Sequence, residues 1–205
     1  MGLTLENLKK MFAAAARDID ENEAYLCSLD AVCGDGDHGV AIRGAIDAAA
    51  DAVAAAPDVK NAFSDAGMAA MGNSNGSTSS IYGTLLMGIG DAIKSAEPEA
   101  AEIAEAFESA LASMREVVKG GVGDKTCFDA LIPAIAAMKG QPTVAELFAA
   151  AADAAKNGAD GTVELVAKFG RARNLGEKSR GSKDPGAVSN AMIFAAFARV
   201  LSKQF

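Results

Sequence analysis

Tryptophan is absent from the 205-residue sequence, and aromatic residues make up 5% of it. The apolar half of the chain is dominated by alanine instead. Sheet proteins fill their cores with aromatic and β-branched side chains, whereas alanine is the best helix former, so the composition favours close-packed helices over a β-sandwich. A chain of this length is expected to form one domain, residues 1–205.

Histidine occurs once, as His38, and cysteine three times, as Cys27, Cys33 and Cys127. One histidine cannot supply a His-based zinc site or a Ser-His triad with a spare base. The cysteines lack metal-ligand spacing and cannot all pair, as expected for reduced thiols.

No signal-peptide core follows the N-terminus, and no apolar run approaches the roughly 20 residues of a membrane span. We expect a cytoplasmic protein that does not associate with a membrane.

Positive charge is scarce, since 19 basic residues stand against 27 acidic ones and give a net charge of -8. Such a chain repels phosphate backbones, which argues against nucleic acid as a partner. If the ligand carries phosphate, the repulsion must be reversed locally by metal ions, helix N-termini or a few placed cations.

Helical spacing of apolar residues is clear in two long segments, residues 5–19 and 103–118. Thr143 and Glu146 form a capping box that begins another helix, which Asn157-Gly158 is expected to end. The segment 187–201 is apolar on most sides and predicts a deeply packed helix.

Further helices are expected near residues 22–30, 39–55, 60–71, 80–94 and 125–139, because glycine, proline and small polar residues separate these segments. The pattern predicts an all-α protein, a bundle or ring of about eight antiparallel helices joined by short loops.

Four glycine-containing segments interrupt the helices, at residues 34–39, 73–80, 120–126 and 170–186. In the first, Asp35 and Asp37 point to one side of an extended backbone, and Asp30 lies one short turn upstream. Carboxylates gathered without a cation repel one another, and oxygen ligands of this kind suit Mg2+ together with phosphate. The alternative is an Asp/Gly-rich turn with solvated carboxylates.

The second segment, Asn75 to Ser80, precedes an apolar helix and offers hydroxyls and free N–H groups to a phosphate. A serine-capped helix start is the alternative, and the segment is no Walker P-loop because no Gly-Lys-Ser/Thr ends it. His38 is either an ordinary hydrogen-bonding residue or a phosphate contact.

Six basic residues gather in the third and fourth segments, where they form either a solvated face or a set of phosphate contacts. They are Lys125, Arg171, Arg173, Lys178, Arg180 and Lys183.

Over essentially its whole length the chain resembles the L subunit, or C-terminal kinase domain, of dihydroxyacetone kinases. Four motifs carry the resemblance in the family's order: Leu29-Asp30 with residues 34–39, then residues 76–84, then Gly123-Asp124-Lys125-Thr126, then residues 170–187 with Leu175-Gly176-Glu177 inside them.

The resemblance implies an eight-helix antiparallel barrel with a nucleotide across one end and two Mg2+ ions held by Asp30, Asp35 and Asp37. ADP or ATP would be surrounded by His38, Gly39, Ser77, Thr78, Gly120, Cys127, Arg171, Asp184, Pro185 and Gly186. No catalytic residue is assigned within this chain, because the resemblance implies a substrate held covalently on a histidine of a separate K subunit. A homodimer is expected.

Four positions depart from the family's usual pattern: Ala41, Ser79, Asn174 and Lys178. The last two lie in the loop that is expected to face the partner or its substrate, so another ketose or ketone is an alternative to dihydroxyacetone.

Two kinds of kinase subunit fit the resemblance. One exchanges ATP, and the other keeps ADP bound and is rephosphorylated by a phosphohistidine protein of the phosphotransferase system. A compact chain without a fused K domain favours the second kind. A different class also stays open, a non-catalytic, nucleotide-bound regulator that acts on a transcription factor.

Overall fold

The structure, a computed structural model, describes residues 2–73 and 76–202. Asn75, the first residue of one expected phosphate-binding segment, lies outside these ranges. The described residues form helices and no strand, which confirms the predicted all-α class. The elements are α1 (Leu5–Glu21), α2 (Glu23–Cys33), α3 (His38–Ala55), α4 (Val59–Asn73), α5 (Ser77–Ala92), α6 (Ala100–Val117), α7 (Phe128–Met138), α8 (Val144–Gly161), α9 (Pro185–Ser202) and two 3-10 segments, η1 (Thr162–Glu164) and η2 (Arg171–Ser179).

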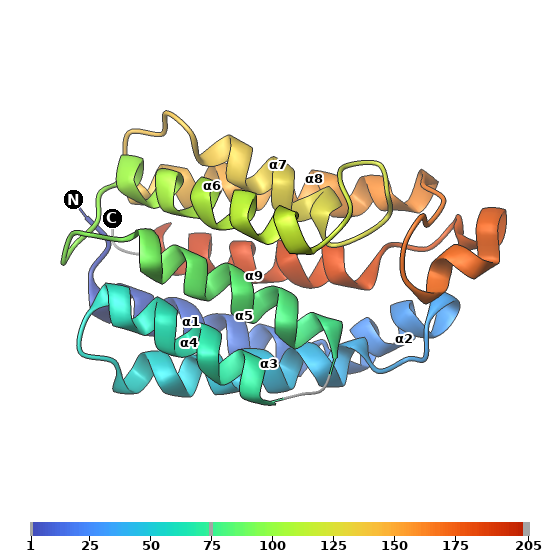
Figure 1. The fold of residues 1–205 in the computed structure, drawn as a ribbon, viewed down its shortest axis with the longest axis horizontal. Coiled ribbons are helices and arrows are strands. Elements are labelled where there is room, and N and C mark those ends of the chain that lie inside the picture. The colour runs from blue at the N-terminus through green and yellow to red at the C-terminus, as the bar shows by residue number, and fades with distance from the viewer. Residues whose placement is uncertain (1, 74–75, 203–205) are drawn as a thin grey trace.

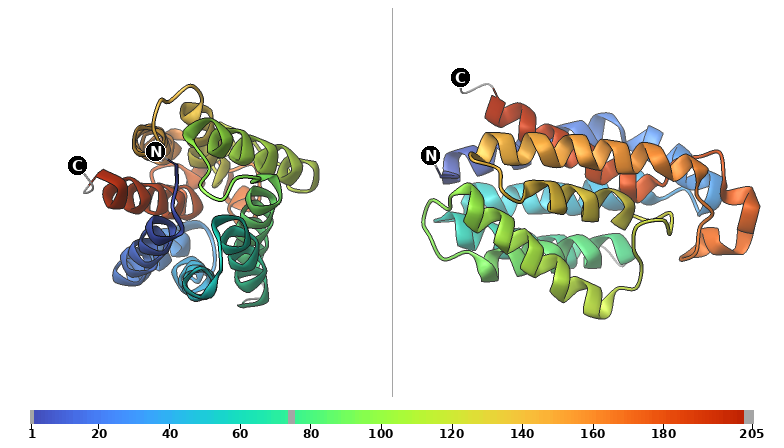
Figure 2. Two further views of the ribbon diagram at one scale, coloured as in Figure 1. Left: turned by 90° about the vertical axis from the view of Figure 1, so that its left-hand side faces the viewer. Right: turned by 90° about the horizontal axis from the view of Figure 1, so that it is seen from above.

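Eight of the helices form a closed ring, in which each packs against its neighbours in the order α1, α3, α4, α5, α6, α7, α8, α9 and back to α1. Successive helices run antiparallel (Figures 1 and 2). The remaining short helix, α2, extends from the ring at one end and contacts η2 there. The predicted eight-helix antiparallel barrel is therefore confirmed, with α2 as an addition to the connection between α1 and α3.

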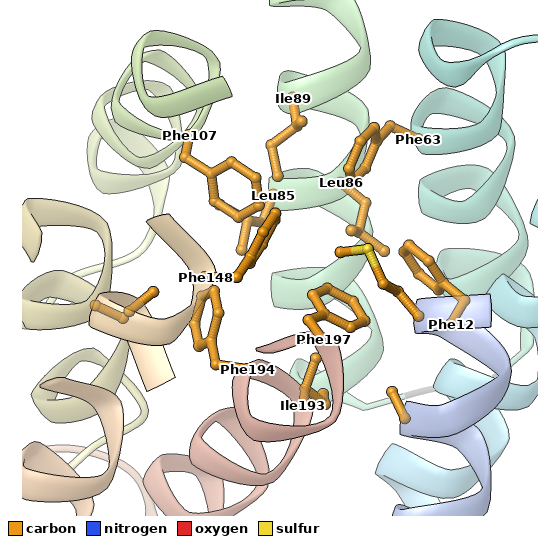
Figure 3. Packing of buried hydrophobic residues seen from close by; sticks show 14 of the residues in the cluster. Phe12, Phe63, Leu85, Leu86, Ile89, Phe107, Phe148, Ile193, Phe194 and Phe197 are labelled. Atoms are coloured by element: carbon orange, nitrogen blue, oxygen red, sulfur yellow. The ribbon is translucent and has the colours of Figure 1, made fainter. Parts of the chain in front are cut away.

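Phenylalanine side chains fill the middle of the barrel (Figure 3). They contact one another from five different helices, mostly edge to face, with ring centroids 5.3–6.3 Å apart. Aromatic pairs of this geometry stabilise a core beyond the effect of burying their area. The contacting residues are Phe12, Phe63, Phe107, Phe148, Phe194 and Phe197.

The helix α9 packs on α1, α7 and α8, which confirms the deeply packed helix predicted for residues 187–201. Among the described residues it is the one helix long and apolar enough to cross a membrane by length and composition. Half of that window is buried inside the protein, and Phe194 and Phe197 belong to the aromatic core. Its apolar character is thus accounted for by its place in the barrel.

The helix α8 confirms one predicted boundary and corrects the other. Thr143 Oγ1 accepts a hydrogen bond from the backbone N–H of Glu146 at 3.2 Å, as the capping box requires. The predicted stop at Asn157-Gly158 is wrong, because α8 continues to Gly161. Gly158 serves a close approach between helices instead: a Cβ there would lie 1.9 Å from the carbonyl oxygen of Asp129 at the start of α7.

Candidate functional site

A cavity of about 490 Å³ opens at one end of the barrel. It lies at the end where α3, α5, α7 and α9 begin, because every second helix of an antiparallel ring starts at the same end (Figure 1). The first residues of these helices, or those just before them, line it: His38, Ser77, Phe128 and Pro185.

Backbone N–H groups at two of these helix starts have no side-chain cap. The N-cap residues Asp37 and Gly76 make no capping hydrogen bond for α3 and α5, whereas the first N–H of α7, that of Phe128, donates to Thr126 Oγ1 at 3.2 Å. The first N–H groups of a helix have no partner within the helix, and they carry its positive partial charge. Their convergence makes this end receptive to anions although the whole chain carries a net charge of -8.

Three carboxylates converge at the rim of the cavity, as the sequence predicts. Oxygens of Asp30, Asp35 and Asp37 lie within 4.8 Å of one another. Asp30 Oδ2 accepts hydrogen bonds from the N–H groups of Gly36 at 2.9 Å and Asp37 at 3.1 Å, so its carboxylate shapes the loop. Gly34 permits this fold, since a Cβ there would lie 2.2 Å from Asp30 Oδ1.

The charge of this acidic cluster is only partly neutralised. Arg171 of η2 forms an ion pair with Asp35, and this hydrogen-bonded guanidinium lowers the pKa of that carboxyl. Desolvation, followed by the charges of Asp35 and Asp30, raises the pKa of Asp37. Two carboxylates thus have no basic side chain paired with them among the described residues, an arrangement that suits a divalent cation.

His38 is half-buried and belongs to a chain of polar side chains whose other members, Ser189 and Tyr82, are buried. Its Nε2 lies 3.0 Å from Ser189 Oγ on α9, and the hydroxyl of Tyr82 on α5 lies 3.4 Å from the same oxygen. Ser189 Oγ also donates to the carbonyl of Gly186 at 3.1 Å. Burial lowers the pKa of His38, which favours its neutral form. Three helices of the ring are joined here at the floor of the cavity.

Asp184 and Cys127 are half-buried titratable groups of the cavity wall. Burial raises the pKa of Asp184 to about 7, while its Oδ1 accepts the N–H of Ala187 at 2.8 Å at the start of α9. Burial likewise raises the pKa of the Cys127 thiol to about 12, so this residue is a neutral lining group.

All but two of the residues predicted for the site line this one cavity. Gly39 is buried against α2 and Gly120 lies beside the ring of Phe128, so neither reaches it. The lining predicted residues are Asp30, Asp35, Asp37, His38, Ser77, Thr78, Cys127, Arg171, Asp184, Pro185 and Gly186.

The basic residues are less concentrated at the site than the sequence suggests. Arg173, Lys178 and Arg180 do not line the cavity. Lys183 lines it but pairs with Asp160 at 2.6 Å. Lys125 also lines the cavity, but it is buried and its Nζ donates to backbone carbonyls.

Several residues that line the cavity were not predicted from the sequence, among them Tyr82, Phe169 and Ser182.

The sequence prediction also missed the role of Asp129 in the turn before α7. Asp129 is a buried carboxylate that accepts the N–H groups of Gly123 and Thr126. The helix expected from residue 125 begins at Phe128 because these bonds fold residues 123–126 into a turn. The signal for Asp129 was its place three residues after Thr126, where a carboxylate can reach back to a turn.

The fold and the site together define an all-helical barrel protein with a polar, anion-receptive cavity and an acidic cluster at one end. The chain belongs to the DAK2 domain family, whose model matches residues 32–199.

The chain is similar both to proteins of about its own length and to longer proteins that contain a matching segment. The PEP-dependent dihydroxyacetone kinase 2, ADP-binding subunit DhaL of Listeria innocua is 32% identical over 193 residues, which cover 90% of this chain and 89% of that protein. The L-erythrulose kinase of Pectobacterium atrosepticum is 36% identical over 201 residues, 92% of this chain. The chain spans 34% of the length of that kinase.

A solved structure has the same fold. The dihydroxyacetone kinase from C. freundii in complex with AMP-PNP and Mg2+ matches with a TM-score of 0.74 and 27% identity over 93% of this chain, which spans 33% of that one.

Proposed function

We propose that this chain is the nucleotide-binding, phosphoryl-transferring subunit of a kinase that acts on dihydroxyacetone or a related short ketose. The observation that carries the proposal is the convergence of three carboxylates and four helix starts on one cavity. It is supported by the similarity to an ADP-binding kinase subunit over nearly the whole of both chains.

Magnesium would be held by Asp30, Asp35 and Asp37, and two ions are proposed. The fit rests on oxygens of three carboxylates within 4.8 Å of one another, of which only Asp35 forms an ion pair among the described residues. When bound, Mg2+ supplies positive charge that screens the phosphate oxygens during transfer.

The phosphates of ADP or ATP would lie between the acidic cluster and the starts of α5, α7 and α9. Ser77 and Thr78 offer hydroxyls and N–H groups there, and Arg171 stands at the rim beside Asp35. The chain's own contribution is thus positioning and charge neutralisation, the main devices that proteins apply to phosphoryl transfer.

The acceptor would be presented by a separate K-type subunit that docks over the cavity. The site residues proposed above are assigned to the nucleotide and to Mg2+. None of them is assigned as a base that would take a proton from the acceptor. Relatives named as L-erythrulose kinase and dihydroxyacetone kinase support a ketose of three or four carbons as the acceptor. Assembly of this chain as a homodimer is part of the proposal.

Of the two kinase types, we favour the one in which bound ADP is rephosphorylated by a phosphohistidine carrier. The similar Listeria innocua subunit is named as PEP-dependent, and this chain covers 89% of it.

Reconstitution tests the proposal. The purified chain with ATP, Mg2+ and dihydroxyacetone should give no sugar phosphate above background, and adding a K-type subunit should start transfer. Orientation can account for roughly 7–11 kcal/mol of a barrier, so its absence removes measurable turnover. Robust phosphorylation by the isolated chain would refute the split site.

Three further experiments distinguish the acceptor, the two kinase types and the non-catalytic regulator. Erythrulose in place of dihydroxyacetone tests the acceptor. ADP with a phosphohistidine carrier, set against excess ATP, separates the two kinase types. Capture of a transcription regulator without any K-type subunit, together with no transfer in any mixture, would favour the non-catalytic regulator.

A further inference from the structure

Lys125 is a buried cation that faces carbonyl groups. It is 4% exposed, and its Nζ donates hydrogen bonds to the carbonyl oxygens of Thr162 at 2.6 Å and Ser182 at 2.5 Å. No carboxylate forms an ion pair with it among the described residues. Burying an ammonium group is costly unless it is hydrogen-bonded, so these two bonds must hold for the cation to stay inside.

The backbone around Lys125 is fixed by a second buried charge. Lys125 has a φ of 57°, the one positive value outside glycine in the part of the chain that the structure describes. Asp129 holds this turn, because its Oδ1 accepts the N–H of Gly123 at 2.6 Å and its Oδ2 that of Thr126 at 2.7 Å. A backbone conformation of this kind persists where the surroundings fix it, often at functional sites.

The two carbonyls that Lys125 binds lead directly to the cavity. Thr162 Oγ1 accepts the N–H of Asp184 at 2.9 Å, and Asp184 Oδ1 accepts the N–H of Ala187 at 2.8 Å. Ser182 is two residues before Asp184 and itself lines the cavity. Lys125 therefore joins the turn before α7 to the segment that sets the start of α9.

We propose that Lys125, oriented by Asp129, is a positioning residue that holds residues 182–186 in place as one wall of the nucleotide cavity. The inference rests on the proposed function, since it assumes that a nucleotide occupies this cavity. Lys125 acts through Thr162 and Ser182, and two of its three N–H donors are used there.

The test compares Lys125→Met, Lys125→Gly and Lys168→Met in Mg-ADP binding by calorimetry. Lys125→Met keeps most of the stem but loses the ammonium group, and Lys125→Gly also relieves the positive φ. Lys168 is the matched control, because its exposed Nζ contacts the same turn before α7 from outside, by pairing with Asp124 at 2.8 Å. Both Lys125 variants should bind Mg-ADP roughly 10- to 100-fold more weakly, as for other supporting residues around metal sites. Lys168→Met should bind like the wild type.

Hydrogen exchange without nucleotide separates positioning from general stability. In Lys125→Met, the amides of Asp184 and Ala187 should exchange faster, while those of α4 and α5 keep their protection. Wild-type affinity in Lys125→Met or Lys125→Gly would overturn the proposal, and so would an equal loss of protection in all helices. A wild type that fails to bind Mg-ADP would count against the proposed function itself.

Discussion

The imidazole Nε2 of His38, the first residue of α3, lies 3.0 Å from the hydroxyl oxygen of Ser189 on α9. The Tyr82 hydroxyl from α5 shares the same oxygen at 3.4 Å. One serine thus connects three helices of the barrel beneath the cavity.

Ser189→Ala should lower the free energy of unfolding by about 1–3 kcal/mol, because it leaves the buried Tyr82 hydroxyl and His38 without this partner. Urea unfolding measures the loss. Ser202→Ala on the same helix removes an exposed hydroxyl that donates to Arg199, and should change stability by less than about 0.5 kcal/mol. Equal effects of the two substitutions would show that the shared serine contributes no special stability.

Asp37→Asn should weaken Mg-dependent ADP binding by at least about tenfold, while the fold survives, because the substitution removes one proposed ligand and relieves repulsion within the acidic cluster. Calorimetry with and without Mg2+ measures both affinities. Asp153→Asn, an exposed carboxylate on α8, is the control for the change of net charge. Unchanged affinity in Asp37→Asn would rule out its role as a metal ligand.

Arg171→Lys should weaken nucleotide binding by roughly tenfold, since one hydrogen bond to a charged group contributes about 1.5 kcal/mol and lysine cannot reproduce the planar fork of arginine. Lys178→Arg, on the same 3-10 segment but outside the cavity wall, should bind almost like the wild type. Both substitutions conserve charge, so the ranking of the two affinities is the measurement. A reversed ranking would mean that Lys178 is the residue in contact with the ligand.

Asp184 should make the protein without nucleotide and metal less stable as the pH rises. Burial raises its pKa from 3.8 to about 7 in the folded state. Stability from this group is therefore complete below pH 3.8 and is lost as the pH rises through 7, by up to about 4 kcal/mol. Asp184→Asn stays neutral and should lose less stability between pH 5 and 8, as denaturant unfolding would show. Identical pH profiles for both proteins would contradict the raised pKa.

Gly158→Ala should destabilise the protein by about 1–3 kcal/mol, because the new Cβ would overlap the carbonyl oxygen of Asp129 where α8 meets α7. Gly161→Ala, at the end of the same helix and with nothing within 4 Å of the new Cβ, should stabilise it by about 0.5 kcal/mol. Thermal unfolding of both variants measures the contrast. A similar small effect at both positions would remove the close contact as the reason for Gly158.

Local patterns predicted the elements of the barrel well. The spacing of apolar residues and the capping box at Thr143 depend on neighbours a few residues away, and the structure agrees with both. The convergence of Asp30, Asp35 and Asp37 was predictable for the same reason, since all three lie within one loop and the turn before it.

What the sequence did not reveal depends on contacts between distant segments. Gly158 has the local appearance of a helix stop, but it lies within α8 because the start of α7 crosses it. From the sequence, Lys125 resembles a phosphate contact. In the structure its ammonium group donates hydrogen bonds to carbonyl oxygens 37 and 57 residues later in the chain. No local pattern encodes which carbonyl a lysine will meet.

The ring has a practical consequence for how this protein is handled. Leu5 and Ser202, which begin α1 and end α9, lie at the pole opposite the cavity (Figure 1). An 18-residue helix such as α9 is about 27 Å long, so anything attached near either of these residues begins that far from the cavity mouth. An affinity tag or a surface tether at either place leaves the mouth free, whereas a tether meant to reach the mouth along the barrel needs at least about eight extended residues.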